Sequence, residues 1–471
     1  MAARAPLDLA HQTEGSQFLR DNDAAALFDE QGLGKSKQVI DAMAAQIAEG
    51  VIGAALIVCP NGLKSNWAGE IEKFCNLSYA VFGSGKAERR VAFQSLKAAF
   101  YVINYEAVAA ELPSMRALLR FKPIALVLDE SHRIKTPEAK TTRAIHALRG
   151  LAARRYILSG TPVANKPEDL WAQMMFLDDG RALGASFDEF KKVYGSSSSG
   201  YRNLDQLRDR VAARSMRRLK AGTLDLPEKQ YRRVCVPLAG RQAQMYEAMR
   251  NELALWVRGM DGEQVLTSAD AILARLVRLA QLASNPAMVD AAYQEQPAKF
   301  LALDTLLSRY FQDPNQKVLL WTSFVENIGT LRQRYAQWHP VCIYGEVGVD
   351  ERDAAVRSFK TDAATRLLIA NPAAAREGLT LTEANVAVYV DRTFNLVDYL
   401  QSQDRIHRIS QTRACEIVLL VAQNTVDEFI DFTLEQKHRL AQYAQADKDN
   451  LAPEDALLAK PDEIRELIQR I

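Results

Sequence analysis

The sequence predicts an α/β protein with two doubly wound lobes, each built on a parallel sheet, and three observations support this prediction. The 471 residues are 48% hydrophobic and 25% charged, which is typical of a soluble globular protein with two or three domains. Short apolar, β-branched runs alternate with longer amphipathic stretches. This alternation occurs twice, and a mainly helical stretch separates the two series, so each series predicts one lobe.

The first series predicts buried parallel strands at 24–29, 55–60, 101–105, 124–130 and 156–160. A helix is expected from Ser36 to Glu49, because Val39, Ile40 and Met43 repeat on one face and Gly50 can end it. The first lobe is therefore expected to span residues 1–203.

The second series predicts strands at 318–324, 341–345, 367–371, 386–391 and 416–422, within a lobe at 291–445. Residues 204–290 are expected to form a helical insert and linker between the lobes. The serine-rich stretch at 196–200 predicts a flexible loop, and residues 446–471 predict a loosely attached helical tail.

Charge and cysteine usage limit the classes of function. The net charge is +1, so a nucleic-acid contact would need a local basic surface. The five cysteines are scattered and odd in number, which indicates buried, reduced thiols. No apolar run is long enough to span a membrane, so we expect a cytoplasmic protein without a membrane partner.

The stretch DEQGLGKSKQ, residues 29–38, predicts a phosphate-binding loop between a strand and a helix. Backbone N–H groups at the helix start and the Lys35 ammonium would hold phosphates, while the Ser36 hydroxyl would reach Mg²⁺. Asp29 stands where the pattern G-x-x-x-x-G-K-[ST] has its first glycine. The alternative is a glycine-rich turn with an incidental lysine.

A second motif, ALVLDESH at 125–132, places two carboxylates at the end of an apolar strand. Asp129 is suited to hold Mg²⁺, and Glu130 to orient or deprotonate the attacking water. His132 could sense the γ-phosphate. The alternative is an acidic N-cap of the following helix.

A third motif, QSQDRIHRISQ at 401–411, carries Arg405 and Arg408 three residues apart on an expected helix. Arginines of a second lobe that reach a γ-phosphate act as arginine fingers. Taken alone, the stretch equally fits a solvated basic helix.

The order of these motifs resembles the Swi/Snf-type DNA-translocase family of helicase superfamily 2, from about Leu7 to Lys437. Further segments share this resemblance, and they are HQTEGSQFL (11–19), LIVCPNGLKSNWAGEIEKF (56–74), YVINYEAV (101–108), LSGTPVANKPEDLW (158–171), SMRRLKAGTLDLPEK (215–229), RLVRLAQLASNP (275–286), IYGEVGVDERDAAVRSF (343–359) and TVDEFIDFTLEQK (425–437).

The resemblance implies two RecA-like lobes and a role for each motif. It assigns to the nucleotide Gln12 on the adenine edge, Gly32, Leu33, Gly34, Lys35, Ser36, Gly378 and Gln401, with Arg405 and Arg408 as catalytic arginines. Residues that link the ATP state to the grip on DNA would be His132, Ser159, Gly160 and Thr161. Candidate DNA contacts are Lys64, Asn66, Thr161, Asn165 and Lys166, for which a solvated surface position is about as plausible.

The sequence departs from the family pattern in three places. Ser131 replaces the alanine of DEAH, and Ser159 replaces a threonine. In NPAAAREGLTLTEAN, residues 371–385, Ala374 and Ala375 stand where glycines are expected, although Gly378 remains. Alanine disfavours the positive-φ backbone that glycine allows.

The resemblance implies a DNA-dependent ATPase that uses ATP and Mg²⁺. It would translocate on double-stranded DNA through sequence-independent backbone contacts and displace bound proteins without obligatory strand separation. The alternatives are a strand-separating or strand-annealing helicase, and a nucleotide-switched DNA- or partner-binding protein. A bacterial or phage-infected cell is the expected setting.

Asp29 is expected to point away from the phosphates, because a carboxylate facing them would be repelled. Gly32 and Gly34 would then supply the close backbone approach.

Overall fold

The computed structural model describes residues 9–83, 85, 97–197, 200–258, 260, 264, 268–374 and 378–445. Within them the chain forms two compact units, one up to Asp225 and one from Leu226 to His438, and the C-terminal end of the last helix belongs to the first unit. The expected tail at 446–471 and Ala375 lie outside the described residues.

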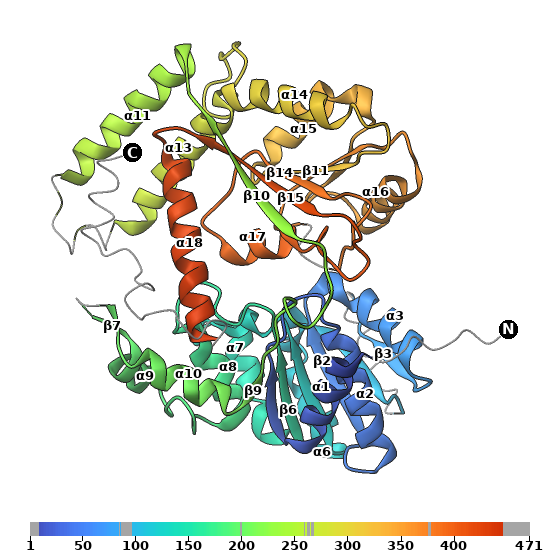
Figure 1. Cartoon of the computed structure of the whole chain (residues 1–471). Helices are drawn as coiled ribbons and strands as arrows, with labels where there is room; N and C mark the ends of the chain where they lie inside the picture. Colours follow the sequence, from blue (N-terminus) through green and yellow to red (C-terminus); the bar gives the residue numbers. More distant parts are fainter. Residues whose placement is uncertain are drawn as a thin grey trace. The chain divides into compact units, whose positions relative to one another are not determined.

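The first unit is built on a parallel sheet, seven-stranded over the residues described, in the order β3-β4-β2-β5-β6-β1-β9 (Figure 1). Its strands are β1 Ala24–Leu27, β2 Ala54–Cys59, β3 Tyr79–Val81, β4 Phe100–Asn104, β5 Ile124–Asp129, β6 Arg154–Leu158 and β9 Ser215–Met216. The five strands predicted from sequence are confirmed, whereas β3 and β9 were not predicted.

Helices of the first unit flank this sheet, and they are α1 Ala10–Asp21, α2 Lys35–Ala48, α3 Lys64–Phe74, α5 Tyr105–Val108, α6 Leu112–Phe121, α7 Lys140–His146, α8 Asp169–Asp178, α9 Phe187–Tyr194 and α10 Leu204–Ala212. On one face, Val39, Met43 and Trp67 pack with Leu27 and Ile57 of the strands in a fully buried core. The apolar stripe expected on residues 36–49 therefore covers the sheet.

The second unit holds a six-stranded parallel sheet among the described residues, in the order β10-β15-β14-β11-β13-β12 (Figure 1). Its strands are β10 Lys229–Val236, β11 Val318–Trp321, β12 Val341–Ile343, β13 Leu367–Ala370, β14 Val386–Tyr389 and β15 Cys415–Ala422. Its helices are α11 Gly240–Arg258, α13 Ala269–Ser284, α14 Ala298–Tyr310, α15 Val325–Arg334, α16 Val349–Thr361, α17 Leu396–Gln403 and α18 Val426–Ala444.

Both faces of the second sheet are covered, because alternate residues of its strands join different cores. Val318 and Leu320 pack with one cluster, whereas Leu319 and Trp321 pack with another. This two-sided burial explains why these strands are continuous apolar runs. The α/β class with two parallel-sheet lobes is confirmed.

Three local features differ from the sequence-based expectations. Residues 196–197 and 200–201 form the paired strands β7 and β8 at the place of the expected flexible loop, while 198 and 199 lie outside the described residues. The stretch at 204–290 contains the helices α10, α11 and α13, as expected, and also the strands β9 and β10. Cys235 is exposed, so the thiols are not all buried. Within the described residues, no helix has both the length and the apolar character needed to cross a bilayer.

Candidate active site

The phosphate-binding loop joins β1 to α2 and depends on two glycines with positive φ. Gly32 has φ +90°, and Gly34, the residue that precedes the first turn of α2, has φ +77°. A side chain would be strained at both positions. In an α-helix the first N–H groups have no partner within the helix itself, and this property makes a helix N-terminus an anion site.

Lys35 opens α2 and lies folded against the loop. Its Nζ donates to the carbonyl oxygens of Asp29 at 2.7 Å and Glu30 at 3.3 Å. Burial lowers the pKa of Lys35, while the carboxylates of Glu130, Asp29 and Asp129 act in the opposite direction. The ammonium is thus held beside the loop that would carry the phosphates.

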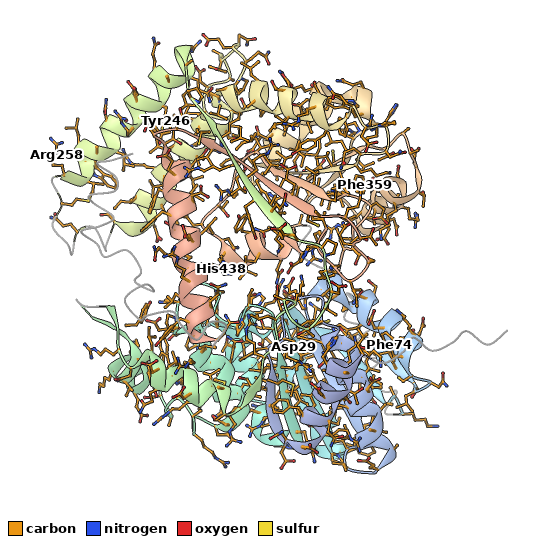
Figure 2. All side chains as sticks on the ribbon, viewed as in Figure 1. Asp29, Phe74, Tyr246, Arg258, Phe359 and His438 are labelled. Atoms are coloured by element: carbon orange, nitrogen blue, oxygen red, sulfur yellow. The ribbon has the colours of Figure 1, made fainter. Side chains whose placement is uncertain are left out.

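Asp29, labelled in Figure 2, follows the end of β1, and its side chain is fully buried. The Arg218 guanidinium donates to both oxygens, from Nε at 3.0 Å and from Nη2 at 2.6 Å. Gln38 Nε2 donates a further bond at 3.1 Å. The carboxylate is thus bonded to Arg218 and Gln38, and its direction relative to bound phosphates stays a prediction.

Helix α1 lies against the same loop. The His11 ring Nε2 is 3.0 Å from the carbonyl oxygen of Leu33. The Gln12 side chain occupies the space in which a Cβ on Gly34 would lie. The residue expected to read adenine therefore touches the turn expected to hold phosphate.

Asp129 ends β5 and is nearly buried, with 9% of its surface exposed. One carboxylate oxygen accepts from Trp67 Nε1 at 2.8 Å and the other from the Glu130 N–H at 2.9 Å. Burial, followed by the Glu130 carboxylate, raises the pKa of Asp129 to about 7, although Trp67 and Lys35 oppose this shift. A nearby cation would stabilise the ionised form.

Glu130 adopts a left-handed backbone conformation with φ +52°, which is rare for glutamate. Its carboxylate lies 3.4 Å from Gln31 Nε2 and 3.3 Å from His132 Nδ1. Backbone strain of this kind is retained where the surrounding structure enforces it, and it clusters at active sites.

A chain of contacts leads from Glu130 to the end of β6. The His132 Nδ1 is also 3.3 Å from the Ser159 hydroxyl, which accepts from the Thr161 N–H at 3.1 Å. A Cβ on Gly160 would lie 2.6 Å from the Gln31 side chain, so this position has no room for one. Since β5, β6 and β1 are neighbours, their carboxyl ends bring the expected nucleotide and coupling residues of this unit together.

The residues present fit a Mg²⁺ ion that arrives with a nucleotide. Magnesium is usually held by one or two carboxylates together with substrate phosphates and water. Asp129 supplies a buried carboxylate, and Ser36 supplies a half-buried hydroxyl on the first turn of α2.

In the second unit the expected residues meet around the segment after α17. Arg405 is 2% exposed and donates to the carbonyl oxygens of Gln401 and Leu379. Arg408 donates to the Thr380 hydroxyl at 2.8 Å. Gly378 has φ +73°, a conformation that suits glycine.

The prediction that one helix carries both arginines was wrong. Helix α17 ends at Gln403, and the two arginines lie in the turns that follow.

The candidate DNA contacts differ in exposure. Asn66 and Lys166 are exposed, and Lys64 and Asn165 are partly exposed. Thr161 is only 8% exposed, and its hydroxyl has no hydrogen-bond partner among the residues described. Their contact with DNA stays a prediction.

Four residues of the site were missed from the sequence. Trp67 donates to the Asp129 carboxylate, and the Tyr105 hydroxyl donates to the Asp129 carbonyl oxygen. Arg218 and Lys220 approach the phosphate loop. A signal existed for Arg218, because a buried carboxylate requires a partner and SMRRLKAG is basic.

Two protein-family models match the chain. The SNF2-related domain covers residues 11–288, and the helicase conserved C-terminal domain covers residues 298–410.

Relatives with related names match nearly the whole chain. It is 27% identical over 91% of its length to the chromodomain-helicase-DNA-binding protein 1-like of Danio rerio, and 26% identical over 91% to the uncharacterized ATP-dependent helicase MG018 of Mycoplasma genitalium. These matches cover 43% and 41% of the relatives, so the chain spans less than half of their length.

A solved structure, the Sulfolobus solfataricus SWI2/SNF2 ATPase core in complex with dsDNA, is 25% identical, with 96% of each chain covered and a TM-score of 0.45.

Proposed function

The chain belongs to the SNF2-related family of ATPases. From this membership we propose that it is a DNA-dependent ATPase that translocates on double-stranded DNA. We propose further that it displaces or remodels DNA-bound proteins. The observation that carries the proposal is that Lys35, in the loop-to-helix turn after β1, lies close enough to Asp129 and Glu130, at the end of β5, to interact with their charges; β1 and β5 both pair with β6.

In the proposed reaction, the N–H groups at the start of α2 and the Lys35 ammonium bind the phosphates. Asp129 and Ser36 would hold Mg²⁺, which would neutralise phosphate charge. Glu130 orients the attacking water and accepts its proton. Its left-handed backbone fixes the carboxylate at the strand end instead of leaving it on a flexible loop.

We assign the second unit a catalytic part through Arg405 and Arg408. Arginines of this kind stabilise charge on the transferring phosphoryl group and contribute roughly 10³ to 10⁵ in rate. Gln401 and Gly378 would complete the nucleotide contacts on that side.

The contact chain from Glu130 through His132 to Ser159 supports a coupling role. Occupancy of the γ-phosphate site would change the bonds of His132, and through Ser159 the conformation of the loop at 160–166. Because Asn165 and Lys166 lie on this loop, the grip on a DNA backbone would follow the nucleotide state.

DNA binding through the backbone predicts a characteristic salt response. For each phosphate neutralised, log affinity falls by roughly 0.9 per log unit of salt. The solved SWI2/SNF2 core named above was bound to dsDNA, which motivates duplex DNA as the partner. A bacterial relative motivates the cytoplasm of a bacterial or phage-infected cell as the setting.

The decisive experiment compares ATP hydrolysis by the purified protein with no nucleic acid, single-stranded DNA, duplex DNA and RNA. We expect duplex DNA to stimulate turnover most strongly, and Lys35→Ala to abolish it. Equal rates in all four conditions would overturn DNA dependence. Displacement of a triplex-forming strand from a duplex would then report movement along it.

The word helicase in the relatives' names favours one second candidate, a strand-separating enzyme. A fluorophore–quencher duplex with a single-stranded tail distinguishes the two. ATP-dependent release of the labelled strand would replace the translocase-only proposal.

A further inference from the structure

The chain segment from Arg214 to Lys220 is hydrogen-bonded along β1 and then along the phosphate loop itself. Three backbone bonds of 2.8–2.9 Å make this ladder, and they join Ala26 N to Arg214 O, Phe28 N to Met216 O, and Glu30 N to Arg218 O. The third bond lies beyond both strands and inside the loop. The segment is therefore an edge that continues onto the nucleotide site.

Side chains of the same segment reinforce this edge. Arg217 donates to the carbonyl oxygens of Phe28 and Gly160. It therefore joins the start of the phosphate loop to the segment after β6 that holds Gly160, one of the expected coupling residues. The Lys220 N–H donates to the Glu30 carboxylate at 2.8 Å, and the Lys220 side chain lies against Gly32. Three of the segment's residues thus contact the nucleotide site.

Arg218 makes the central contact. It binds Asp29 through two nitrogens, and it also donates to Gln38 at 2.8 Å and to the His11 carbonyl oxygen. The remaining acidic group that faces it, Glu14, is exposed and lies 3.4 Å away. Asp29 is fully buried, so removal of the arginine would leave an uncompensated charge beneath the loop.

Helix α1 packs against the Asp29–Arg218 pair at Gly15, where there is no room for a side chain. A Cβ on Gly15 would overlap Gln38 and lie 2.6 Å from Arg218 Nη2. The pair therefore determines how closely α1, which carries Gln12, approaches Gly34.

We propose that Arg218 is a positioning residue for ATP binding. Through its bonds to Asp29 it fixes the phosphate loop. Through its contact with α1 it fixes the position of Gln12 against that loop. The first unit ends only a few residues later, at Asp225. The segment 214–220, which leads out of this unit, is therefore hydrogen-bonded to the proposed nucleotide site. The inference rests on the proposed nucleotide site but not on DNA translocation.

The test measures KM and kcat for ATP without DNA, and the Kd of a fluorescent ATP analogue. We expect Arg218→Gln to raise KM and Kd by roughly 10-fold to 100-fold, with a much smaller change of kcat at saturating ATP. Arg218→Lys keeps the charge without the two-pronged geometry, and we expect a smaller rise. In Asp29→Asn/Arg218→Gln the buried charge is gone, so affinity should return most of the way to wild type.

Arg214→Gln is the matched control, because Arg214 is an exposed arginine on the same segment. Its KM should equal that of the wild type. Unchanged KM in a folded Arg218→Gln or Arg218→Lys variant would overturn the proposal. So would a double variant as impaired as Arg218→Gln alone. DNA-free measurements separate this outcome from a failure of the proposed translocation.

Discussion

Glu130 combines a strained backbone with a carboxylate that contacts Gln31 and His132. A residue held in this way is suited to a task that depends on position, such as orienting water. Replacement by glutamine keeps the shape and removes the base.

We therefore expect Glu130→Gln to lower kcat for ATP by about 10²-fold to 10⁴-fold while the affinity for ATP stays close to that of the wild type. Steady-state hydrolysis and binding of a fluorescent analogue measure the two quantities. Glu138→Gln, at an exposed position nearby, is the control and should change neither. Loss of binding in Glu130→Gln would argue for a role in holding the nucleotide instead.

Asp129 provides a pH-dependent prediction in the absence of Mg²⁺ and nucleotide. Its pKa is raised to about 7 in the folded state, above the ordinary 3.8, so its stabilising contribution is complete below about pH 4 and is lost as pH rises through 7. Asp129→Asn should match the wild type in unfolding free energy near pH 4 and exceed it at pH 8, by on the order of 4 kcal/mol at most.

Denaturant titrations in EDTA at both values of pH measure this difference. A variant that is less stable than the wild type at pH 8 would show that the ionised carboxylate stabilises the empty site.

Individual site residues were predictable from sequence to different degrees. Lys35 follows a strand and Asp129 ends one, and both belong to short motifs that local chemistry identified. Arg218 lies 189 positions from Asp29 in the sequence, and only the fold brings the two together. Trp67 lies in a noted motif, yet its bond to Asp129 depends on the path of α3.

Among the elements, α1 depends on a glycine for its packing. A Cβ on Gly15 would overlap Gln38, whereas a Cβ on Gly69 in α3 would meet no atom within 4 Å. We expect Gly15→Ala to lower stability, and Gly69→Ala to raise it by roughly 0.5–1 kcal/mol through helix propensity.

Thermal melting of both variants measures the contrast, and Gly15→Ala should also weaken ATP-analogue binding. Equal melting temperatures for the two variants would indicate that α1 shifts to accommodate the methyl group without cost.

The strands show what periodicity can and cannot predict. Fully apolar runs such as Ala54–Cys59 and Val318–Trp321 were predicted because both faces are buried. Strand β10 contains Tyr231 and Arg233 and is partly exposed as an edge strand, so it lacked that signal. Strand β9 has two residues, and its pairing with β1 depends on the fold.

At the scale of the whole molecule, the expected catalytic residues are divided between two units. We predict that Arg408→Ala lowers ATP hydrolysis by roughly 10³-fold to 10⁵-fold with little change of ATP affinity, because the phosphate loop belongs to the first unit. Arg408 is preferable to Arg405 for this test, since Arg405 is 2% exposed and supports the fold of its unit.

Single-turnover hydrolysis and analogue binding measure this separation. Arg357→Ala, at an exposed position on α16, is the matched control. Normal hydrolysis by Arg408→Ala would remove the second unit's arginine from the proposed mechanism.

The pairing of β10 with β15 has a consequence for biosynthesis. These strands are the first and last of the second sheet along the chain, and they pair over their full lengths from Lys229↔Cys415 to Val236↔Ala422. During translation β10 is therefore made long before β15, and until then its backbone N–H and C=O groups lack the partners that β15 provides in the folded sheet. The charged side chains of Arg232 and Arg233 on β10 would disfavour pairing of this strand with other nascent chains. We expect the second sheet to be completed only near the end of translation, after the first unit's sheet is already formed.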